Sequence, residues 1–288
     1  MRPLKFHPIL KQTLWGGERI IPYKELASGL SRVGESWELS GMPGSESVVA
    51  EGPWAGSTLS ELIGRFGAEL LGKANYARFG QEFPLLVKFI DAREDLSIQV
   101  HPDDELARKR HGKSGKCEMW YVLEAEPGAS LLTGFSRPIA PAEYERRVAD
   151  NTLTDVLNRQ AIASGDVFYL PAGRVHSIGK GSFIVEIQQS SDITYRIYDF
   201  DRRDAAGNSR ELHTELAREA IDFESSENSR ITYAPENNQE VRLVTTPYFT
   251  TSLYTLTART RCDWSATDSF VAIVLLQGSG SLTDNEGN

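Results

Sequence analysis

The chain has 288 residues, of which 40% are hydrophobic and 25% are charged, the usual composition of a globular protein with a sizeable core. Its formal net charge of −9 and its pI near 5.2 exclude the strongly basic surface that nucleic-acid-binding proteins need. Two cysteines, Cys117 and Cys262, are too few for a disulfide framework and indicate a reducing compartment.

The N-terminal residues lack the pattern of a signal peptide. The longest apolar run, 270–276, is far shorter than the roughly 20 residues that span a bilayer. We therefore expect a cytoplasmic protein with no membrane partner and no nucleic-acid partner. An acidic chain still binds an anionic substrate where lysines and arginines converge locally.

The first third of the chain predicts short strands and one helix. Residues 3–50 alternate strand-like runs with glycine and proline. A helix is predicted over 57–72, because Thr58 and Glu61 form a capping-box pattern ahead of apolar residues at helical spacing. The apolar run 83–92 has the length of a buried strand and contains Lys88. This lysine either extends its ammonium group to solvent at an edge or belongs to a site.

Polar residues of chemical interest begin at position 97. Ser97, Gln99 and His101 alternate along a predicted strand, so all three project from one face. A polar helix is predicted over 103–111, because acidic residues follow a proline at its start. The strand pattern then resumes, and its alternation places Lys116 and Glu118 on one face.

The rest of the chain alternates helical insertions with strands. Residues 141–158 predict helix with a break near Asn151, and a further helix is predicted over 213–223. The polar segment 224–240 is the best candidate for a linker, and strand-like runs return from 241 onward.

A second histidine follows a characteristic turn. The spacing from Gly165 to His176 is G-x5-P-x-G-x2-H, in which Pro171 and Gly173 make a tight turn that directs the next strand inward. Two imidazoles, the Gln99 amide and the Glu118 carboxylate are a plausible ligand set for a divalent metal ion. We expect the fold to bring these two distant stretches together.

These motifs resemble those of a protein superfamily and, within it, those of one family. The Gly165–His176 spacing resembles the second motif of the cupin jelly-roll proteins, with Lys180 where asparagine is usual. The first cupin motif is altered, because Gln99 and His101 replace a histidine pair and the carboxylate comes only at Glu118. This altered form resembles the type I mannose-6-phosphate isomerase (phosphomannose isomerase) family in its short bacterial form. The supporting stretches are 98–104, 115–123, 170–179 and 190–200.

The resemblance implies a mainly β fold: a cupin-type jelly-roll barrel with helical insertions and a second, smaller C-terminal β domain. We expect a catalytic domain over 1–223, with helical insertions near 57–72, 103–111 and 141–158. The linker 224–240 would lead to a partial jelly roll over 241–288, since a complete second barrel needs further strands.

The resemblance also implies an activity and a site. It implies a metal-dependent aldose-ketose isomerase that interconverts mannose 6-phosphate and fructose 6-phosphate through a cis-enediol, with one Zn²⁺ or another divalent ion per chain. By position in the family pattern, the residues divide into metal ligands (Gln99, His101, Glu118, His176), catalytic groups (Arg196, Lys116, Glu186) and substrate-binding groups (Lys88, Ser97).

Other interpretations stay open at the level of sequence. Two histidines and one carboxylate also suit an iron-dependent cupin oxygenase, and a non-catalytic sugar-binding or regulatory cupin can keep a metal for structure. Arg196 can instead pair with Asp192 or Asp199 on a strand surface, and Glu186 can be an internal salt-bridge partner. The sequence leaves the oligomeric state and the catalytic base undetermined.

Overall fold

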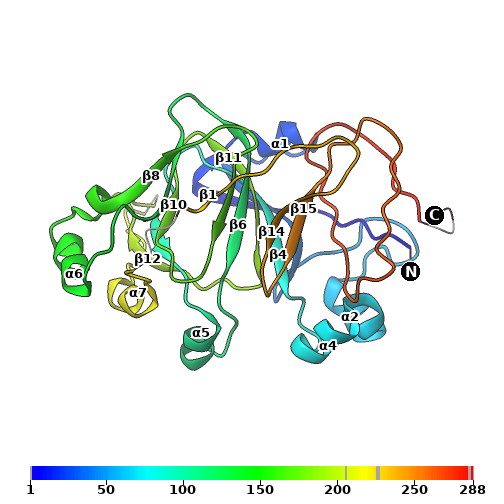
Figure 1. The fold of residues 1–288 in the computed structure, drawn as a ribbon, viewed down its shortest axis with the longest axis horizontal. Coiled ribbons are helices and arrows are strands. Elements are labelled where there is room, and N and C mark those ends of the chain that lie inside the picture. The colour runs from blue at the N-terminus through cyan, green and yellow to red at the C-terminus, as the bar shows by residue number, and fades with distance from the viewer. Residues whose placement is uncertain (1, 205, 225–227, 285–286, 288) are drawn as a thin grey trace.

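The computed structural model describes residues 2–204, 206–224, 228–284 and 287. Antiparallel sheets form its centre (Figure 1). The first sheet has the order β1 (Ile9–Gly17), β2 (Val33–Met42), β4 (Leu85–Asp91), β11 (Ser182–Gln189), β6 (Glu118–Ala125), β9 (Val167–Leu170) and β13 (Arg230–Ile231), and β3 (Ser45–Glu46) pairs with β2. The second sheet has the order β12 (Tyr195–Tyr198), β5 (Ile98–Val100), β10 (His176–Ile178), β7 (Ser130–Phe135) and β8 (Leu157–Ala161). The expected mainly β, jelly-roll class is confirmed.

The two sheets face each other across a shared core. Ile90 and Trp120 of the first sheet are buried in one cluster with Leu131 and Ile178 of the second. Strand alternation decides which side chains enter this interior. On β4, Val87 and Phe89 belong to a different cluster on the outer face, so Lys88 between them points inward.

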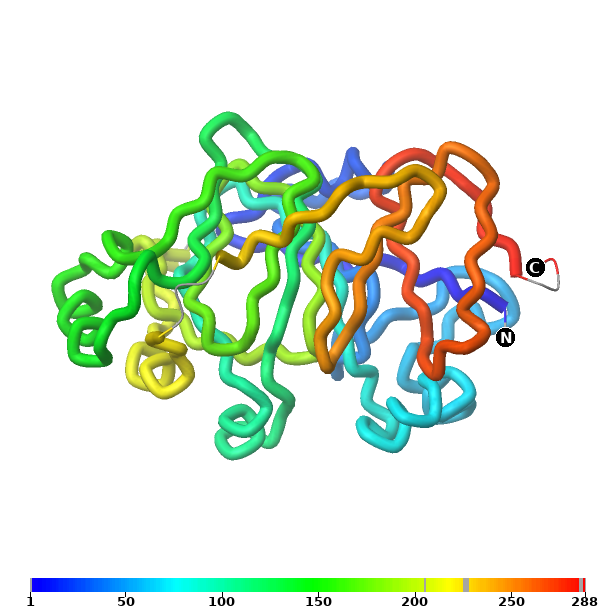
Figure 2. The backbone as a smooth tube through the Cα atoms, in the orientation of Figure 1, coloured from blue at the N-terminus to red at the C-terminus, as the bar shows by residue number. Residues whose placement is uncertain are grey.

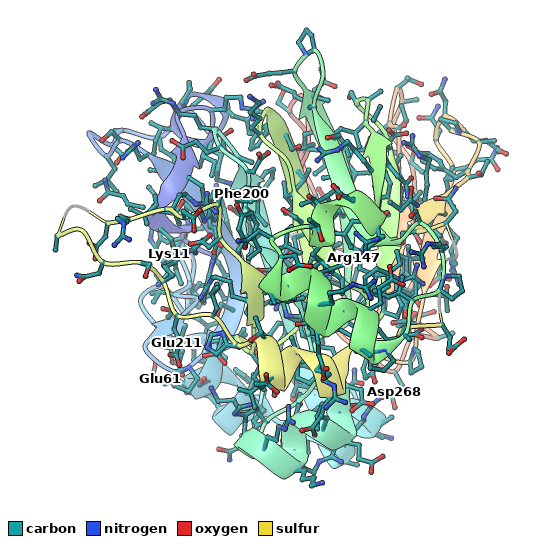
Figure 3. All side chains as sticks on the ribbon, turned by 90° about the vertical axis from the view of Figure 1, so that its left-hand side faces the viewer. Lys11, Glu61, Arg147, Phe200, Glu211 and Asp268 are labelled. Carbon is teal, nitrogen blue, oxygen red and sulfur yellow. The ribbon has the colours of Figure 1, made fainter. Side chains whose placement is uncertain are left out.

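Helices cover the outer faces of both sheets. They are α1 (Ile20–Tyr23), α2 (Leu59–Phe66), α3 (Ala68–Leu71), α4 (Lys73–Phe79), α5 (Asp104–His111), α6 (Pro141–Ala149), the 3₁₀ helix η1 (Leu153–Val156) and α7 (Thr214–Ala220). Figure 3 shows α6 and α7 in front of the second sheet, where Tyr144 and Ala217 pack on its outer residues. The backbone turns between α6 and η1 at Asn151, whose φ of 55° is left-handed.

The start of α2 shows how local sequence sets an element. The amide of Glu61 donates to the Thr58 hydroxyl at 3.2 Å, and the amide of Thr58 donates to the Glu61 carboxylate at 2.9 Å. This reciprocal capping box satisfies two amides that a helix N-terminus otherwise leaves unpaired.

The C-terminal part packs beside the outer face of the first sheet (Figure 2). Strands β14 (Val241–Thr245) and β15 (Thr250–Leu253) form a hairpin, and the described residues beyond it form no helix or strand. Phe270 packs on Phe83 with ring centroids 4.8 Å apart. Residues 225–227 of the expected linker lie outside the described residues, and the domain division remains a prediction. Among the described residues, no helix is long and apolar enough to cross a membrane.

Candidate metal centre and active site

Three strands from both sheets bring the predicted ligands together. In the second sheet His176 of β10 lies opposite Gln99 of β5. His101 follows β5 directly, and α5 then carries the chain outward before it returns to Glu118 at the start of β6. Because β6 belongs to the first sheet, the carboxylate faces the two histidines across the interior of the fold.

The ligand atoms converge within a few ångströms. Nε2 of His176 lies 3.2 Å from Oε1 of Glu118, and Nε2 of His101 lies 3.5 Å from Oε2. The potential ligand atoms of all three residues lie within 4.8 Å of one another, and all three are buried. The expected meeting of the two sequence stretches therefore occurs.

Backbone contacts orient both imidazoles. Nδ1 of His101 donates to the carbonyl of Ile193 at 2.8 Å, and Nδ1 of His176 donates to the carbonyl of Arg174 at 2.8 Å. A proton on Nδ1 leaves the lone pair on Nε2, the atom that faces Glu118. This tautomer is the one that ligates a metal through Nε2.

Burial keeps these imidazoles neutral. It lowers the pKa of His176 to about 4, and burial together with Lys116 lowers the pKa of His101 well below its ordinary value. Burial, followed by repulsion from Glu186, raises the pKa of Glu118 to about 7. A positive ion among these groups would favour the ionised carboxylate.

The residues present fit a divalent ion. A tetrahedral ion with bonds of about 2.1 Å keeps its ligand atoms about 3.4 Å apart. The separations of 3.2 and 3.5 Å, each to a different oxygen of Glu118, lie close to this value, and neither oxygen accepts a well-oriented hydrogen bond from a described residue. The Gln99 amide nitrogen lies 3.3 Å from Nε2 of His176. Rotation of that amide exchanges its nitrogen with its oxygen, the atom that ligates metals.

Two further predicted residues touch the ligand set. The Ser97 hydroxyl donates to Oε1 of Gln99 at 3.2 Å. The Lys116 ammonium lies 2.7 Å from Oε2 of Glu118 and 3.0 Å from Nε2 of His101. Lys116 is itself buried, so its charge acts on the site in an environment that water screens little.

Lys88 and Glu186 form a buried ion pair on the inner face of the first sheet. They lie opposite each other on β4 and β11, with Nζ 2.8 Å from Oε2. Burial alone raises the pKa of Glu186, but attraction by Lys88 and Lys116 outweighs it and lowers the pKa to about 2. Burial alone lowers the pKa of Lys88, but attraction by Glu186 outweighs burial and raises that pKa above its ordinary value. Both groups are therefore charged at neutral pH.

Arg196 lies directly opposite Gln99 on the neighbouring strand β12. Its Nη1 donates to the carbonyl of Glu211 at 2.9 Å, and its buried Nε has no hydrogen-bond partner among the described residues. The two acidic residues considered as its partners bind other cations instead: Asp192 pairs with Lys113, and Asp199 pairs with Arg202 and Arg210.

Comparison with known proteins places this chain in a family. The model for the phosphomannose isomerase type I catalytic domain matches residues 4–133. A probable mannose-6-phosphate isomerase of Bacillus subtilis, GmuF, is 35% identical over 286 residues, which cover 98% of this chain and 88% of that protein. This chain belongs to the type I phosphomannose isomerase family.

Two further comparisons agree with this membership. The mannose-6-phosphate isomerase of Streptococcus mutans is 34% identical over 284 residues, covering 98% of this chain and 87% of that protein. The crystal structure of the mannose 6-phosphate isomerase from Bacillus subtilis matches with a TM-score of 0.78 at 32% identity, over 87% of this chain and 79% of that chain.

Two tryptophans of this phosphomannose isomerase fold contact the site but were not among the predicted site residues. The indole of Trp120 is fully buried and donates to Oε1 of Glu186 at 3.0 Å, while its ring lies edge-on to His176 with centroids 5.4 Å apart. The Trp37 ring lies 5.6 Å from the Lys88 ammonium. Alternation along each strand signals an inward face for both, but only the strand pairing shows which residues they meet.

The Lys88–Glu186 pair yields a prediction on stability. Lys88→Met leaves a buried carboxylate without its cation, so we expect the free energy of unfolding to fall by about 3–5 kcal/mol. Adding Glu186→Gln removes that charge and keeps an oxygen for the Trp120 indole. The double variant should therefore recover much of the loss in urea unfolding. Equal instability of the single and double variants would contradict the account.

Proposed function

We propose that this chain is a metal-dependent isomerase that interconverts mannose 6-phosphate and fructose 6-phosphate. The observation that carries the proposal is the convergence of two neutral imidazole Nε2 atoms on the buried Glu118 carboxylate. Gln99 completes a four-ligand set for one divalent ion, and zinc suits such nitrogen and oxygen ligands. Its relatives of similar length bear the name mannose-6-phosphate isomerase. Its two free cysteines fit the reducing cytoplasm.

The reaction moves a proton between C2 and C1 of the open-chain sugar through a cis-enediol. Negative charge develops on O1 or O2 as the proton leaves carbon, and a bound divalent ion supplies Lewis-acid stabilisation for that charge. The chain's own cations add to this stabilisation. Lys116 lies against two of the ligands, and Arg196 stands on the strand beside Gln99. Preorganised charge of this kind acts most strongly where water is excluded.

Among the proposed acid–base groups, Lys116 fits proton transfer better than Glu186. Both Glu186 oxygens accept hydrogen bonds, one from Lys88 and one from Trp120, and the lowered pKa makes this carboxylate a weak base. We infer that Glu186 contributes its charge and fixes Lys88. The Lys116 ammonium lies at the ligand set, and Glu118 is its one acidic partner in the described ion pairs.

The substrate phosphate requires cations whose charge is not already compensated. Lys88 is paired with Glu186, whereas Arg202 and Arg210 share the carboxylate of Asp199, and Arg196 forms no ion pair among the described residues. The Nε atoms of Arg196 and Arg202 are buried and have no hydrogen-bond partner among the described residues. We propose that Arg202 and Arg210 bind the phosphate, that Arg196 faces the reacting end of the sugar, and that Lys88 and Ser97 contact the sugar nearer the metal.

Arg196→Ala tests the proposed catalytic role. We expect kcat to fall by on the order of 10²–10³, because a cation that acts on transition-state charge is removed. Fold and metal content should be unchanged, and Arg196→Lys should restore activity only partly, since an ammonium lacks the planar guanidinium fork. Steady-state kinetics, circular dichroism and metal analysis measure these outcomes. A change in KM alone would show uniform substrate binding instead of catalysis.

A coupled assay tests the function as a whole. Purified protein with analysed metal content should convert mannose 6-phosphate to fructose 6-phosphate, and a chelator should abolish the conversion. Metal-bound protein without isomerase activity would favour the non-catalytic sugar-binding alternative. Consumption of dioxygen would favour the iron oxygenase.

A further inference from the structure

We propose that Asp104 is a positioning residue that fixes Lys116 and Glu118 relative to His101, and that it connects the C-terminal hairpin to the metal site. The inference rests on the proposed metal-dependent function. Asp104 is the first residue of α5, the helix that separates His101 from Glu118 along the chain. The sequence pattern indicated only that Asp104 lies at the start of that helix.

The Asp104 carboxylate accepts hydrogen bonds from three separate segments. Its Oδ1 accepts from the amide of Gly115 at 2.9 Å and from the side-chain amide of Gln189 at 3.0 Å. Its Oδ2 accepts from the Tyr248 hydroxyl at 3.1 Å. Burial raises its pKa, but these hydrogen bonds outweigh that effect and lower it, so the carboxylate is ionised at neutral pH.

These contacts belong to a larger set that holds three successive backbone amides. The amide of Gly115 donates to Asp104, that of Lys116 donates to the carbonyl of Pro102 at 3.1 Å, and that of Cys117 donates to Oε1 of Gln189 at 2.9 Å. The side-chain amide of Gln189 thus donates to Asp104 through its nitrogen and accepts from the Cys117 backbone amide through its oxygen. The stretch 115–117 is tied at every residue to the chain that follows His101 or to the end of β11.

Close packing gives this attachment little freedom. A Cβ atom on Gly115 would lie 2.5 Å from the carbonyl carbon of Asp103 and 2.6 Å from the amide nitrogen of Asp104. The two backbone segments therefore touch directly. Lys116 lies within the tied stretch and Glu118 follows it immediately, so their distances to His101 depend on it.

Tyr248 brings the C-terminal hairpin into the same network. It lies in the turn between β14 and β15, where Thr246 and Phe249 are hydrogen-bonded to each other. Its hydroxyl reaches a carboxylate that lies 144 residues earlier in the chain. The hairpin thereby contacts the segment that carries Lys116 through one shared acceptor.

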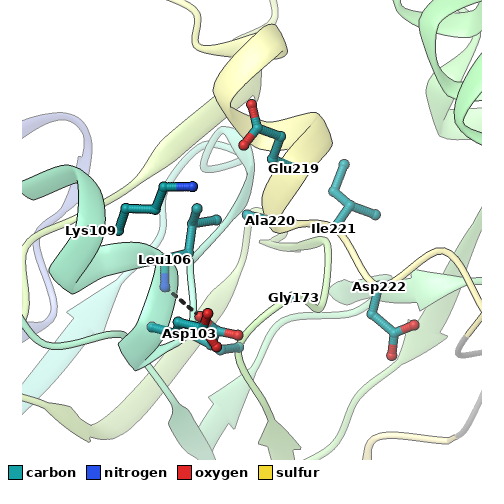
Figure 4. A pocket seen from close by; sticks show the side chains of 10 residues that line it. Asp103, Leu106, Lys109, Gly173, Glu219, Ala220, Ile221 and Asp222 are labelled. Atoms are coloured by element: carbon teal, nitrogen blue, oxygen red, sulfur yellow. Dashed lines mark hydrogen bonds between the residues drawn. The ribbon is translucent and has the colours of Figure 1, made fainter.

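The neighbouring carboxylate Asp103 supplies a matched control. Its Oδ1 accepts from the amide of Leu106 at 2.8 Å and caps α5, beside the hollow between α5 and α7 (Figure 4). No described hydrogen bond joins its side chain to residues 115–117. Asp103→Ala should therefore destabilise the same helix without releasing the tied stretch.

The experiment compares zinc affinity, by competition with a chelator, and kcat at saturating zinc in Asp104→Ala and Asp103→Ala. We expect Asp104→Ala to weaken zinc binding by about 10–100-fold, as loss of an outer-shell contact does, and to lower kcat by about tenfold or more. Asp103→Ala should lower the thermal midpoint and leave zinc affinity and kcat near wild type. Equal effects of both variants, or a lowered midpoint alone in Asp104→Ala, would overturn the proposal.

Tyr248→Phe keeps the ring and removes only the donor, so it tests the link to the hairpin if Asp104→Ala folds poorly. Tyr248→Phe should weaken zinc binding in the wild-type protein. In a protein that already carries Asp104→Ala, it should have no further effect on zinc binding. Unchanged zinc affinity in Tyr248→Phe would refute the connection. Zinc affinity requires no substrate, so a chain that binds zinc without isomerase activity would refute the proposed function and leave the positioning role testable.

Discussion

We expect His101→Ala and His176→Ala each to abolish stoichiometric metal binding and to lower kcat by about 10³-fold or more. Each variant removes one of the two Nε2 atoms that face Glu118. Loss of the ion removes several kcal/mol of charge stabilisation from the transition state, and about 4 kcal/mol corresponds to a factor of about 10³. Metal analysis of the purified variants and a coupled isomerase assay measure the two effects.

His111→Ala is the matched control for these variants. His111 ends α5, and its Nε2 bonds the Tyr195 hydroxyl at 2.8 Å, away from the ligand set. Its loss should leave metal content and kcat near wild type. If both His101→Ala and His176→Ala keep one equivalent of metal, the ligand assignment is wrong.

Unphosphorylated mannose should be a poorer substrate than mannose 6-phosphate by about 10²–10⁴ in kcat/KM. Each charge-assisted hydrogen bond to the phosphate contributes roughly 1.5–3 kcal/mol, and two such bonds account for this range. We expect Arg202, whose buried Nε has no partner among the described residues, and Arg210 to supply these bonds. Steady-state kinetics with both sugars measure the ratio.

Arg202→Ala sharpens this comparison. If Arg202 binds the phosphate, its loss should lower kcat/KM for mannose 6-phosphate and leave the residual turnover of mannose unchanged. Comparable turnover of the two sugars by the unmodified protein would contradict phosphate recognition and indicate an enzyme for free sugars.

The candidate ligand set was largely predictable because its signals are local. Alternation along one strand placed Gln99 and His101 on a common face, and the Pro171–Gly173 turn directed His176 inward. Glu118 entered the candidate set as a carboxylate suited to a divalent ion, although no local pattern joins it to the histidines, and the family resemblance supported it. The structure brings the potential ligand atoms of His101, Glu118 and His176 within 4.8 Å of one another.

Other parts of the site depend on strand register, which local sequence does not encode. Lys88 and Glu186 are 98 residues apart, and only the pairing of β4 with β11 shows that they bind each other. The same holds for Trp120, whose indole meets Glu186 across β6 and β11. In the sequence, Asp104 indicated only a helix N-terminus. Its hydrogen-bond partners Gly115, Gln189 and Tyr248 come from other segments of the chain, and no local pattern joins them to it.

We propose that one divalent ion, held by Gln99, His101, Glu118 and His176, is required for isomerisation. The most direct test of this requirement is the titration of chelator-treated protein with zinc while mannose 6-phosphate turnover is followed. We expect no turnover without metal and a rise in proportion to added zinc that ends at about one equivalent per chain. Full turnover by the metal-free protein would contradict the requirement for the ion.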